Sequence, residues 1–135
     1  MTAPRPPDTD ALFAAILTRL AEVTTVPVFA PKLPTSPDTA IGVDIYNVDT
    51  SRDPHSPDVY VQLRFRTPGD DVRTTHRLAD QVYAALDDLL NERSNTTWGD
   101  VAVLSCHRHI RGMASPDGNG RYTRPDSYTL TVNPS

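Results

Sequence analysis

Cysteine is nearly absent from this sequence, since Cys106 is the only one among 135 residues. No disulfide can form within the chain, which fits a reducing compartment. Long apolar runs are also missing, and the longest, residues 11–17, is too short to span a bilayer. The first ten residues lack the basic start and apolar segment of a signal peptide. We therefore expect no association with a membrane.

Charge and composition limit what this protein can bind and how large its core can be. The formal net charge is −4 at pH 7, which argues against broad nonspecific binding to nucleic acid. Hydrophobic residues make up 38% of the chain and there are 13 prolines, so we expect a modest core and much loop. The length suits one domain over residues 1–135, with residues 1–8 as a flexible N-terminal arm.

The strongest pattern in the sequence occupies residues 58–93. Apolar and polar residues alternate over residues 59–66, which predicts a half-buried strand. A proline–glycine turn with two aspartates follows, and from Val72 apolar residues recur at helical spacing as far as Leu90. One of the aspartates would cap this helix, and Arg93 would suit its negative end. We expect this strand and helix to form the centre of the core.

Another helix and four more strands are predicted around this centre. Residues 8–10 offer three caps for a first helix, whose apolar stripe includes Leu12, Ile16 and Leu20. The strand candidates are residues 26–30, 40–48, 101–110 and 122–133. Because Pro27 cannot donate to a ladder, the first of these strands is expected at an edge of the sheet.

Alternation also predicts which side chains of these strands face inward. In residues 40–48 the inward set is Ile41, Val43, Ile45 and Asn47. In residues 101–110 we expect the even-numbered set around Leu104 to be buried. Pro125 is expected to keep the first half of the last strand off a regular ladder.

The order helix, strand, strand, strand, helix, strand, strand predicts an α+β fold. We expect a single, mostly antiparallel or mixed sheet of about five strands, with both helices on one face. The polar loops over residues 49–58 and 111–120 are expected to be exposed, and to order on assembly with a partner.

No cluster of residues has the spacing of a catalytic or cofactor site. His107 and His109 could supply two zinc ligands, but the further ligands are missing, which favours solvent-facing histidines. Asp87 and Asp88 are neighbours on the predicted helix and cannot face each other, which favours surface charge over an acid pair. Cys106 is expected to be a small buried residue rather than a nucleophile. We expect no enzyme activity, no metal and no cofactor.

The sheet face opposite the two helices is the best candidate for binding. It would have no cover within the chain, and it would carry tyrosines and arginines, which are enriched at interfaces. The candidate interface or lumen residues are Tyr60, Gln62, Arg64, Arg66, Arg108 and Arg111.

Three segments resemble the tail terminator proteins of long-tailed bacteriophages, also called minor tail or minor capsid proteins. The segments are VYVQLRFRTPGDD, RLADQVYAALDDL and DVAVLSCHRHIRGMASPDGNGRYTRPDSYTLTV. The residues that match the family pattern are Gln62, Arg64, Arg66, Ala79, Val82, Ala85, Leu86, Pro116, Asp117, Gly120, Arg121, Tyr128, Leu130 and Val132. The likeness covers most of the chain and consists of structural positions, without a catalytic signature.

The resemblance implies a virion protein that is not an enzyme. Such proteins form a ring, usually hexameric, that caps the finished tail tube, stops its polymerisation and presents a surface for head attachment. The implied partners are other copies of this chain, the tail tube protein and head–tail connector proteins, with DNA touching the lumen in passing. The implied location is the head-proximal end of the virion tail, after assembly in the host cytoplasm. Exposed strand edges and long loops would supply the contacts.

The sequence leaves three alternatives open. A head–tail connector or head-completion protein would also be structural and has a similar layout. A small metal-dependent hydrolase would use His107 and His109 and would require bound metal. A stand-alone α+β binding module would stay monomeric at high concentration.

Overall fold

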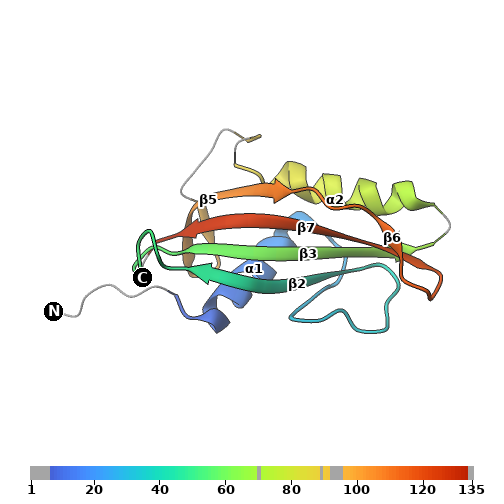
Figure 1. The fold of residues 1–135 in the computed structure, drawn as a ribbon, viewed down its shortest axis with the longest axis horizontal. Coiled ribbons are helices and arrows are strands. Elements are labelled where there is room, and N and C mark those ends of the chain that lie inside the picture. The colour runs from blue at the N-terminus through green and yellow to red at the C-terminus, as the bar shows by residue number, and fades with distance from the viewer. Residues whose placement is uncertain (1–6, 70, 89, 92–95, 134–135) are drawn as a thin grey trace.

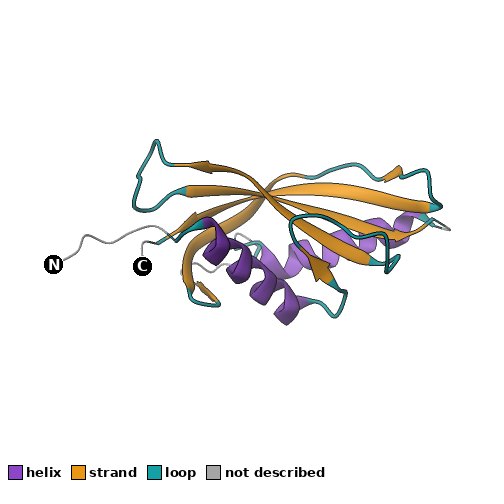
Figure 2. Cartoon of the chain, turned by 90° about the horizontal axis from the view of Figure 1, so that it is seen from below, coloured by secondary structure: helices purple, strands orange, loops and turns teal. Residues whose placement is uncertain are grey.

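The computed structural model describes residues 7–69, 71–88, 90–91 and 96–133. The elements in chain order are α1 (Thr9–Val23), β1 (Val28–Phe29), β2 (Ala40–Asp49), β3 (Asp58–Pro68), α2 (Val72–Leu86), β4 (Thr96–Trp98), β5 (Val101–Ile110), β6 (Ser115–Pro116) and β7 (Arg121–Val132). The expected α+β class is confirmed, and both helices lie on one face of a twisted sheet (Figures 1 and 2). Neither of the described helices lies on the opposite face, and we call it the open face.

Within the described residues the sheet has seven strands, whereas the sequence predicts about five. Its order is β1-β2-β3-β7-β5-β4, with β6 paired to β7. The β1–β2 pair is parallel and the other pairs are antiparallel, so the sheet is mixed. The sequence missed β4 and β6 because strands of two or three residues are too short to show alternation. The predicted edge position of the strand near Pro27 is confirmed.

Strand β3 lies inside the sheet, between β2 and β7, as the sequence predicts (Figure 1). It pairs with β7 without interruption from Asp58 to Pro68. The expected irregularity at Pro125 is wrong for this ladder, because Pro125 pairs with Arg64. The irregularity does occur along the other edge of β7. There β5 pairs with β7 as far as Ser127 and β6 pairs from Thr123, so Pro125, which has no N–H, lies in the unpaired gap between them.

Both helices begin at aspartate caps. The Asp8 carboxylate accepts the Ala11 backbone N–H at 2.8 Å, and the Asp71 carboxylate accepts that of Arg73 at 2.9 Å. Helix α2 ends at Leu86, earlier than the sequence predicts, and Leu90 is therefore 55% exposed rather than part of the apolar stripe. The expected role of Arg93 lies outside the described residues.

One core fills the space between the helices and the sheet. The largest part comes from α1, α2 and the inward faces of β2, β3 and β7. Among the side chains that are at most 2% exposed are Leu12, Ile16, Leu20, Ile41, Val43, Val59, Val61, Leu63, Phe65, Val82, Val103, Tyr128, Leu130 and Val132. Neither of the described helices is long and apolar enough to cross a membrane.

Bulges overturn two of the predicted inward sets. In β2 the register shifts between Ile45 and Asn47, so Asn47 is exposed and Val48 packs against the core instead. In β5 the register shifts after Val103, and the buried residues of this strand are Val101, Val103 and Cys106. The even-numbered set around Leu104 is therefore wrong apart from Cys106, since each extra residue reverses the alternation that follows it.

Asp87 and Asp88 are buried, which corrects the expectation of surface charge. They are 3% and 6% exposed and lie beside the part of β5 that β4 does not cover. The Asp88 carboxylate accepts the Cys106 N–H at 2.9 Å, and the Asp87 carboxylate accepts the Arg108 N–H at 3.0 Å. The Asp88 N–H donates to the Cys106 carbonyl at 2.8 Å. This pair thus satisfies backbone groups that the sheet leaves open.

Candidate interaction surface

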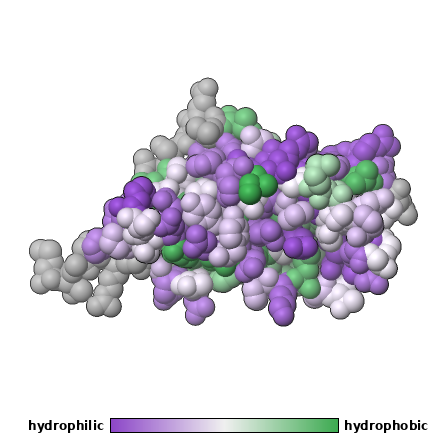
Figure 3. All heavy atoms as spheres, viewed as in Figure 1, coloured by the Kyte–Doolittle hydropathy of each residue, from purple (hydrophilic) through white to green (hydrophobic). Residues whose placement is uncertain are grey.

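The open face carries three of the six predicted interface residues. Tyr60, Gln62 and Arg64 occupy alternate positions of β3 and point away from the helices, as period two requires. The Tyr60 and Gln62 side chains are half-buried and Arg64 is exposed. Figure 3 shows this face as mostly hydrophilic, with a few separate hydrophobic residues. Neither of the described helices covers it (Figure 2).

Three aromatic rings lie close together on this face, and we call them the aromatic ridge: Tyr46 of β2, Tyr60 of β3 and His109 of β5. The ring centres of Tyr46 and Tyr60 are 6.0 Å apart, and those of Tyr60 and His109 are 5.7 Å apart with an interplanar angle of 87°. An edge-to-face contact of this kind is a favourable arrangement of two rings. The ridge is accessible, because Tyr46 is 48% exposed.

Hydrogen bonds fix His109 within the ridge. Its Nδ1 lies 2.8 Å from the Thr129 hydroxyl, and its Nε2 lies 3.3 Å from the Tyr46 hydroxyl. Burial lowers the pKa of His109, and the charge of nearby His107 lowers it further. A neutral imidazole donates at one nitrogen and accepts at the other, which suits two hydroxyl partners. His109 thus acts as a structural link between three strands.

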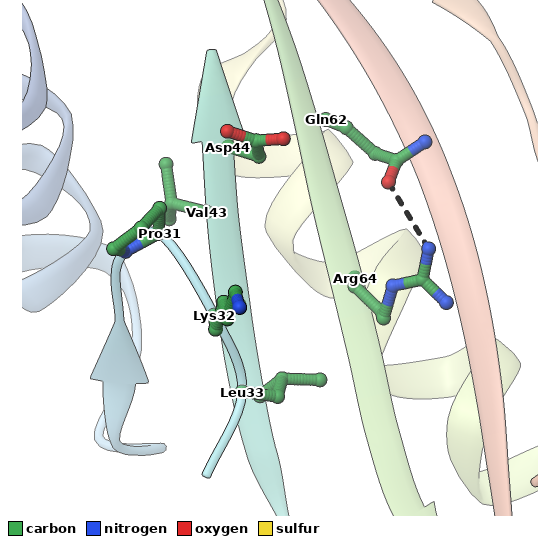
Figure 4. A pocket seen from close by; sticks show the side chains of 8 residues that line it. Pro31, Lys32, Leu33, Val43, Asp44, Gln62 and Arg64 are labelled. Carbon is green, nitrogen blue, oxygen red and sulfur yellow. Dashed lines mark hydrogen bonds between the residues drawn. The ribbon is translucent and has the colours of Figure 1, made fainter. Parts of the chain in front are cut away.

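A groove of about 350 Å³ opens beside the ridge, between β2, β3 and the loop after β1 (Figure 4). Its lining residues are Pro31, Lys32, Leu33, Gly42, Val43, Asp44, Gln62 and Arg64. Figure 4 shows the Arg64 guanidinium turned toward Gln62, to which it donates at 3.2 Å. Leu33 lies directly over Gly42, since a Cβ there would come within 2.7 Å of the leucine Cγ. Asp44, Gln62 and Arg64 make part of the groove lining polar.

Arg66 does not belong to this accessible surface, which corrects its place in the predicted set. It is 4% exposed, and its guanidinium donates to the carbonyls of Pro34 at 2.6 Å, Asp38 at 3.2 Å and Pro37. Burial lowers the pKa of Arg66, and nearby Arg121 adds to this effect. The proline-rich loop of residues 31–38 is thus held over one end of the sheet by a buried cation, which is unavailable to DNA or to a partner.

Arg108 and Arg111 also lie away from Arg64. The Arg108 guanidinium packs 3.6 Å from the centre of the Tyr83 ring of α2 and lies 3.3 Å from the Asp126 carboxylate. Arg111 is exposed at the end of β5 and lies 3.6 Å from Asp80 of α2. The four arginines of the candidate interface set therefore do not lie together on the open face.

Arg108 belongs to a buried ionic network that the sequence analysis missed. Arg124 and Asp126, both 0% exposed, pair at 2.8 Å beneath α2. Arg124 also contacts Asp80 at 3.2 Å and Nδ1 of His76 at 3.0 Å. Such a network is fully satisfied, which is what a charge buried this deeply requires. The signal was available, because Arg124 and Asp126 share the parity of the buried Tyr128 and Leu130.

The remaining chemical candidates are separated in space. Cys106 is 1% exposed, which confirms its expected burial, and it lies on the opposite side of β5 from His107 and His109. Among the described residues, no group of three or more histidine, cysteine, aspartate or glutamate side chains could hold a metal ion. The aromatic ridge and the groove are therefore the features of the open face that could recognise another molecule.

No family model and no curated protein matches this sequence. Solved structures do match it by fold. A chain from the virion of a native gene transfer agent particle superposes with a TM-score of 0.60 at 16% sequence identity. The match covers 84% of this chain and 83% of that chain. At this identity the likeness concerns the fold, and the chain described here shares the fold of that virion component.

Proposed function

We propose that this chain is a structural protein of a virion, and specifically a tail terminator. Copies of the chain, six in number, form a ring that caps the finished tail tube, stops its polymerisation and presents a surface for head attachment. The observation that carries the proposal is the fold shared over 84% of the chain with a component of a gene transfer agent virion. The sequence resemblance to tail terminators supports the same role independently.

The surface of the chain suits a ring. A closed ring is built from head-to-tail contacts, so each copy needs two different patches. The open face with its aromatic ridge supplies one patch of the residue types that interfaces favour. The opposite layer supplies the other, where exposed Arg111 lies next to half-exposed Asp80 of α2. Both patches are built on strands and a helix, so they keep their shape before assembly.

The partners follow from this role. They are further copies of the chain, the tail tube protein and head–tail connector proteins, and DNA passes through the lumen. Arg64 is the member of the predicted lumen set that is both exposed and on the open face, so it is the residue we place nearest to passing DNA. The chain acts by assembly, without enzyme activity or cofactor. Its place is the head-proximal end of the tail, after assembly in the host cytoplasm.

Labelling of particles tests the proposal directly. A tagged chain should be found at one end of the tail in negative-stain images, at the junction with the head. Without the chain, tails should grow beyond their normal length and fail to join heads. Normal tail length with headless tails would instead indicate a head–tail connector. Absence of the chain from purified particles would overturn both structural roles.

A charge reversal tests the part played by the open face. Arg64→Glu should lower the yield of infectious particles about tenfold or more, because a like charge at an interface or lumen costs at least about 1.4 kcal/mol. Arg73→Glu is the matched control, since Arg73 is exposed on α2, away from the open face, and its ion pair among the described residues is with Asp71. Equal yields from the two variants would remove Arg64 from the site.

A further inference from the structure

The end of β5 and the segment after it expose apolar side chains next to a cation. Ile110 is 54% exposed and Met113 is 79% exposed, which are high values for apolar side chains of this size. Arg111 lies between them in the chain, and its side chain is 63% exposed. Methionine and arginine are both enriched at protein interfaces. We call Ile110, Arg111 and Met113 the β5-end patch.

Contacts with β7 hold the backbone of this patch in place. The Gly112 N–H donates to the buried Asp126 carboxylate at 3.0 Å. A Cβ at Gly112 would come within 1.6 Å of the Pro125 carbonyl oxygen, so the backbone here lies directly on β7. The side chains on either side of Gly112 are therefore presented from a fixed position, which lowers the entropy cost of binding.

The patch carries an excess of positive charge. Arg111 lies 3.6 Å from Asp80. The same carboxylate lies 3.5 Å from Arg108 and 3.2 Å from Arg124. Asp126 is the other acid of this network, so among the described residues three guanidinium groups share two carboxylates. Arg111 is the most exposed of the three, and a carboxylate from another molecule would complete its pairing.

The loop between β2 and β3 carries the complementary charge, and we call its residues 49–54 the acidic tip. Asp49 and Asp53 accept backbone N–H groups two residues further along the loop, but neither forms an ion pair with a described residue. Arg52 of the same loop pairs with Asp58 instead. Exposed Pro54 adds an apolar side chain next to Asp53. The tip thus presents two negative charges beside an apolar group.

The acidic tip and the β5-end patch of one molecule lie too far apart to meet. Ile110 pairs with Ser127, which pairs in turn with Gln62 of β3. Gln62 lies four residues from Asp58, which is about 14 Å along a strand, and the two strand spacings from β3 to β5 add about 10 Å sideways. The tip projects in the opposite direction from the end of β5 (Figure 1). A contact between the two features therefore needs two copies of the chain.

We propose that the acidic tip of one copy docks on the β5-end patch of the next copy. Asp53 pairs with Arg111, and Pro54 packs on Met113. Because the tip and the patch are different surfaces, the contact is head-to-tail. A row of copies joined in this way has one free tip and one free patch until a ring closes.

Both features extend the two surfaces that a ring requires. Asp49 follows Tyr46 of the aromatic ridge by three residues, so the tip continues the open face. The β5-end patch reaches Asp80 of α2 through Arg111. The tip-to-patch contact rests on the proposed ring function, and it specifies which side chains join neighbouring copies.

Charge reversal of the two partners, singly and together, tests the contact in the full chain. Arg111→Glu or Asp53→Arg alone should weaken the association of copies about tenfold in sedimentation measurements, because like charges then face each other. The double variant, and an equal mixture of the two single variants, should regain association. Arg73→Glu is the matched control and should change nothing, since Arg73 is exposed and paired with Asp71. A double variant that associates no better than the single variants would overturn the pairing.

Cysteine pairs report the direction of the contact. Pro54→Cys with Met113→Cys should give a ladder of linked copies on oxidation, in concentrated protein or in purified particles. Neither single variant should do so, and the native Cys106, which is 1% exposed, should not react. Linking by one single variant alone would indicate a symmetric contact and overturn the proposal. Absence of the ladder from both samples would also overturn it.

The same experiment separates this contact from the role of the whole protein. A ladder in concentrated protein, with the chain absent from tail ends, would support the contact and refute the terminator role. The chain at tail ends without a ladder in particles or in solution would refute the contact and leave the terminator role standing.

Discussion

The buried Arg66 offers the sharpest test of how this fold holds its loops. Replacing it in Arg66→Met keeps most of the apolar stem and removes the guanidinium that donates to the carbonyls of Pro34, Pro37 and Asp38. A hydrogen bond from a charged donor contributes about 1.5–3 kcal/mol. Two effects make the net contribution of these three hydrogen bonds to stability smaller than their sum. Burial of the cation, which lowers the pKa of Arg66, already costs free energy, and exposed loop carbonyls regain water. We therefore expect a loss of about 2–3 kcal/mol in the free energy of unfolding.

Urea unfolding of the two single variants Arg66→Met and Arg64→Met measures this effect. Arg64 is the matched control, since it lies two residues away on the same strand with its side chain exposed, and its loss should change stability by no more than about 0.5 kcal/mol. Amide hydrogen exchange should accelerate in the loop over residues 32–38 in the Arg66 variant and stay unchanged in the control. Equal stability of the two variants would refute the view that Arg66 clamps this loop.

Three further predictions concern stability. Asp87→Ala should cost about 2 kcal/mol in urea unfolding, because the backbone N–H of Arg108 loses its buried acceptor, and a cost below about 0.5 kcal/mol would contradict the assigned role. Tyr128→Phe should leave stability unchanged or raise it by about 1 kcal/mol, since the buried hydroxyl has no hydrogen-bond partner among the described residues, and a clear loss would reveal a partner. Burial acts to raise the pKa of Asp58, but hydrogen bonds from Arg52 and Thr131 outweigh it and leave this pKa below its usual value. The stability that Asp58 provides should thus be complete above about pH 4 and lost as the pH falls through the lowered pKa. Asp58→Asn should flatten this part of the pH profile, and an unchanged acid limb in thermal melts would count against it.

The spacing of apolar residues and the capping aspartates predicted the central strand and helix of the fold. The alternation before Arg66 and the helical spacing after Val72 identified β3 and α2, and the Asp8 and Asp71 caps set where the helices begin. These signals are local, because they depend on residues that are at most four apart. The placement of both helices on one face followed from their apolar stripes, which must share one core.

The features that the sequence did not predict depend on contacts between segments that are far apart in the chain. The bulge after Val103 reverses the inward set of β5, and Asp87 and Asp88 bind the strand beyond it from 18 to 21 residues away. Arg66 reads as a solvent-facing residue by parity, and it is covered only because the loop of residues 31–38 folds over it. The candidate surface was therefore half predictable: Tyr60, Gln62 and Arg64 followed from alternation, whereas the position of His109 beside Tyr46 required the full sheet.

The Asp87 and Asp88 carboxylates along the edge of β5 limit how copies of this chain can associate. The backbone N–H groups of Cys106 and Arg108 already donate to these carboxylates, so another strand cannot pair with this part of the edge. Open-ended extension of the sheet from copy to copy is therefore blocked there. Association there must use side chains, which allow a limited number of neighbours and a fixed angle between them. A molecule built in this way can remain dispersed at high concentration and still join a finite assembly.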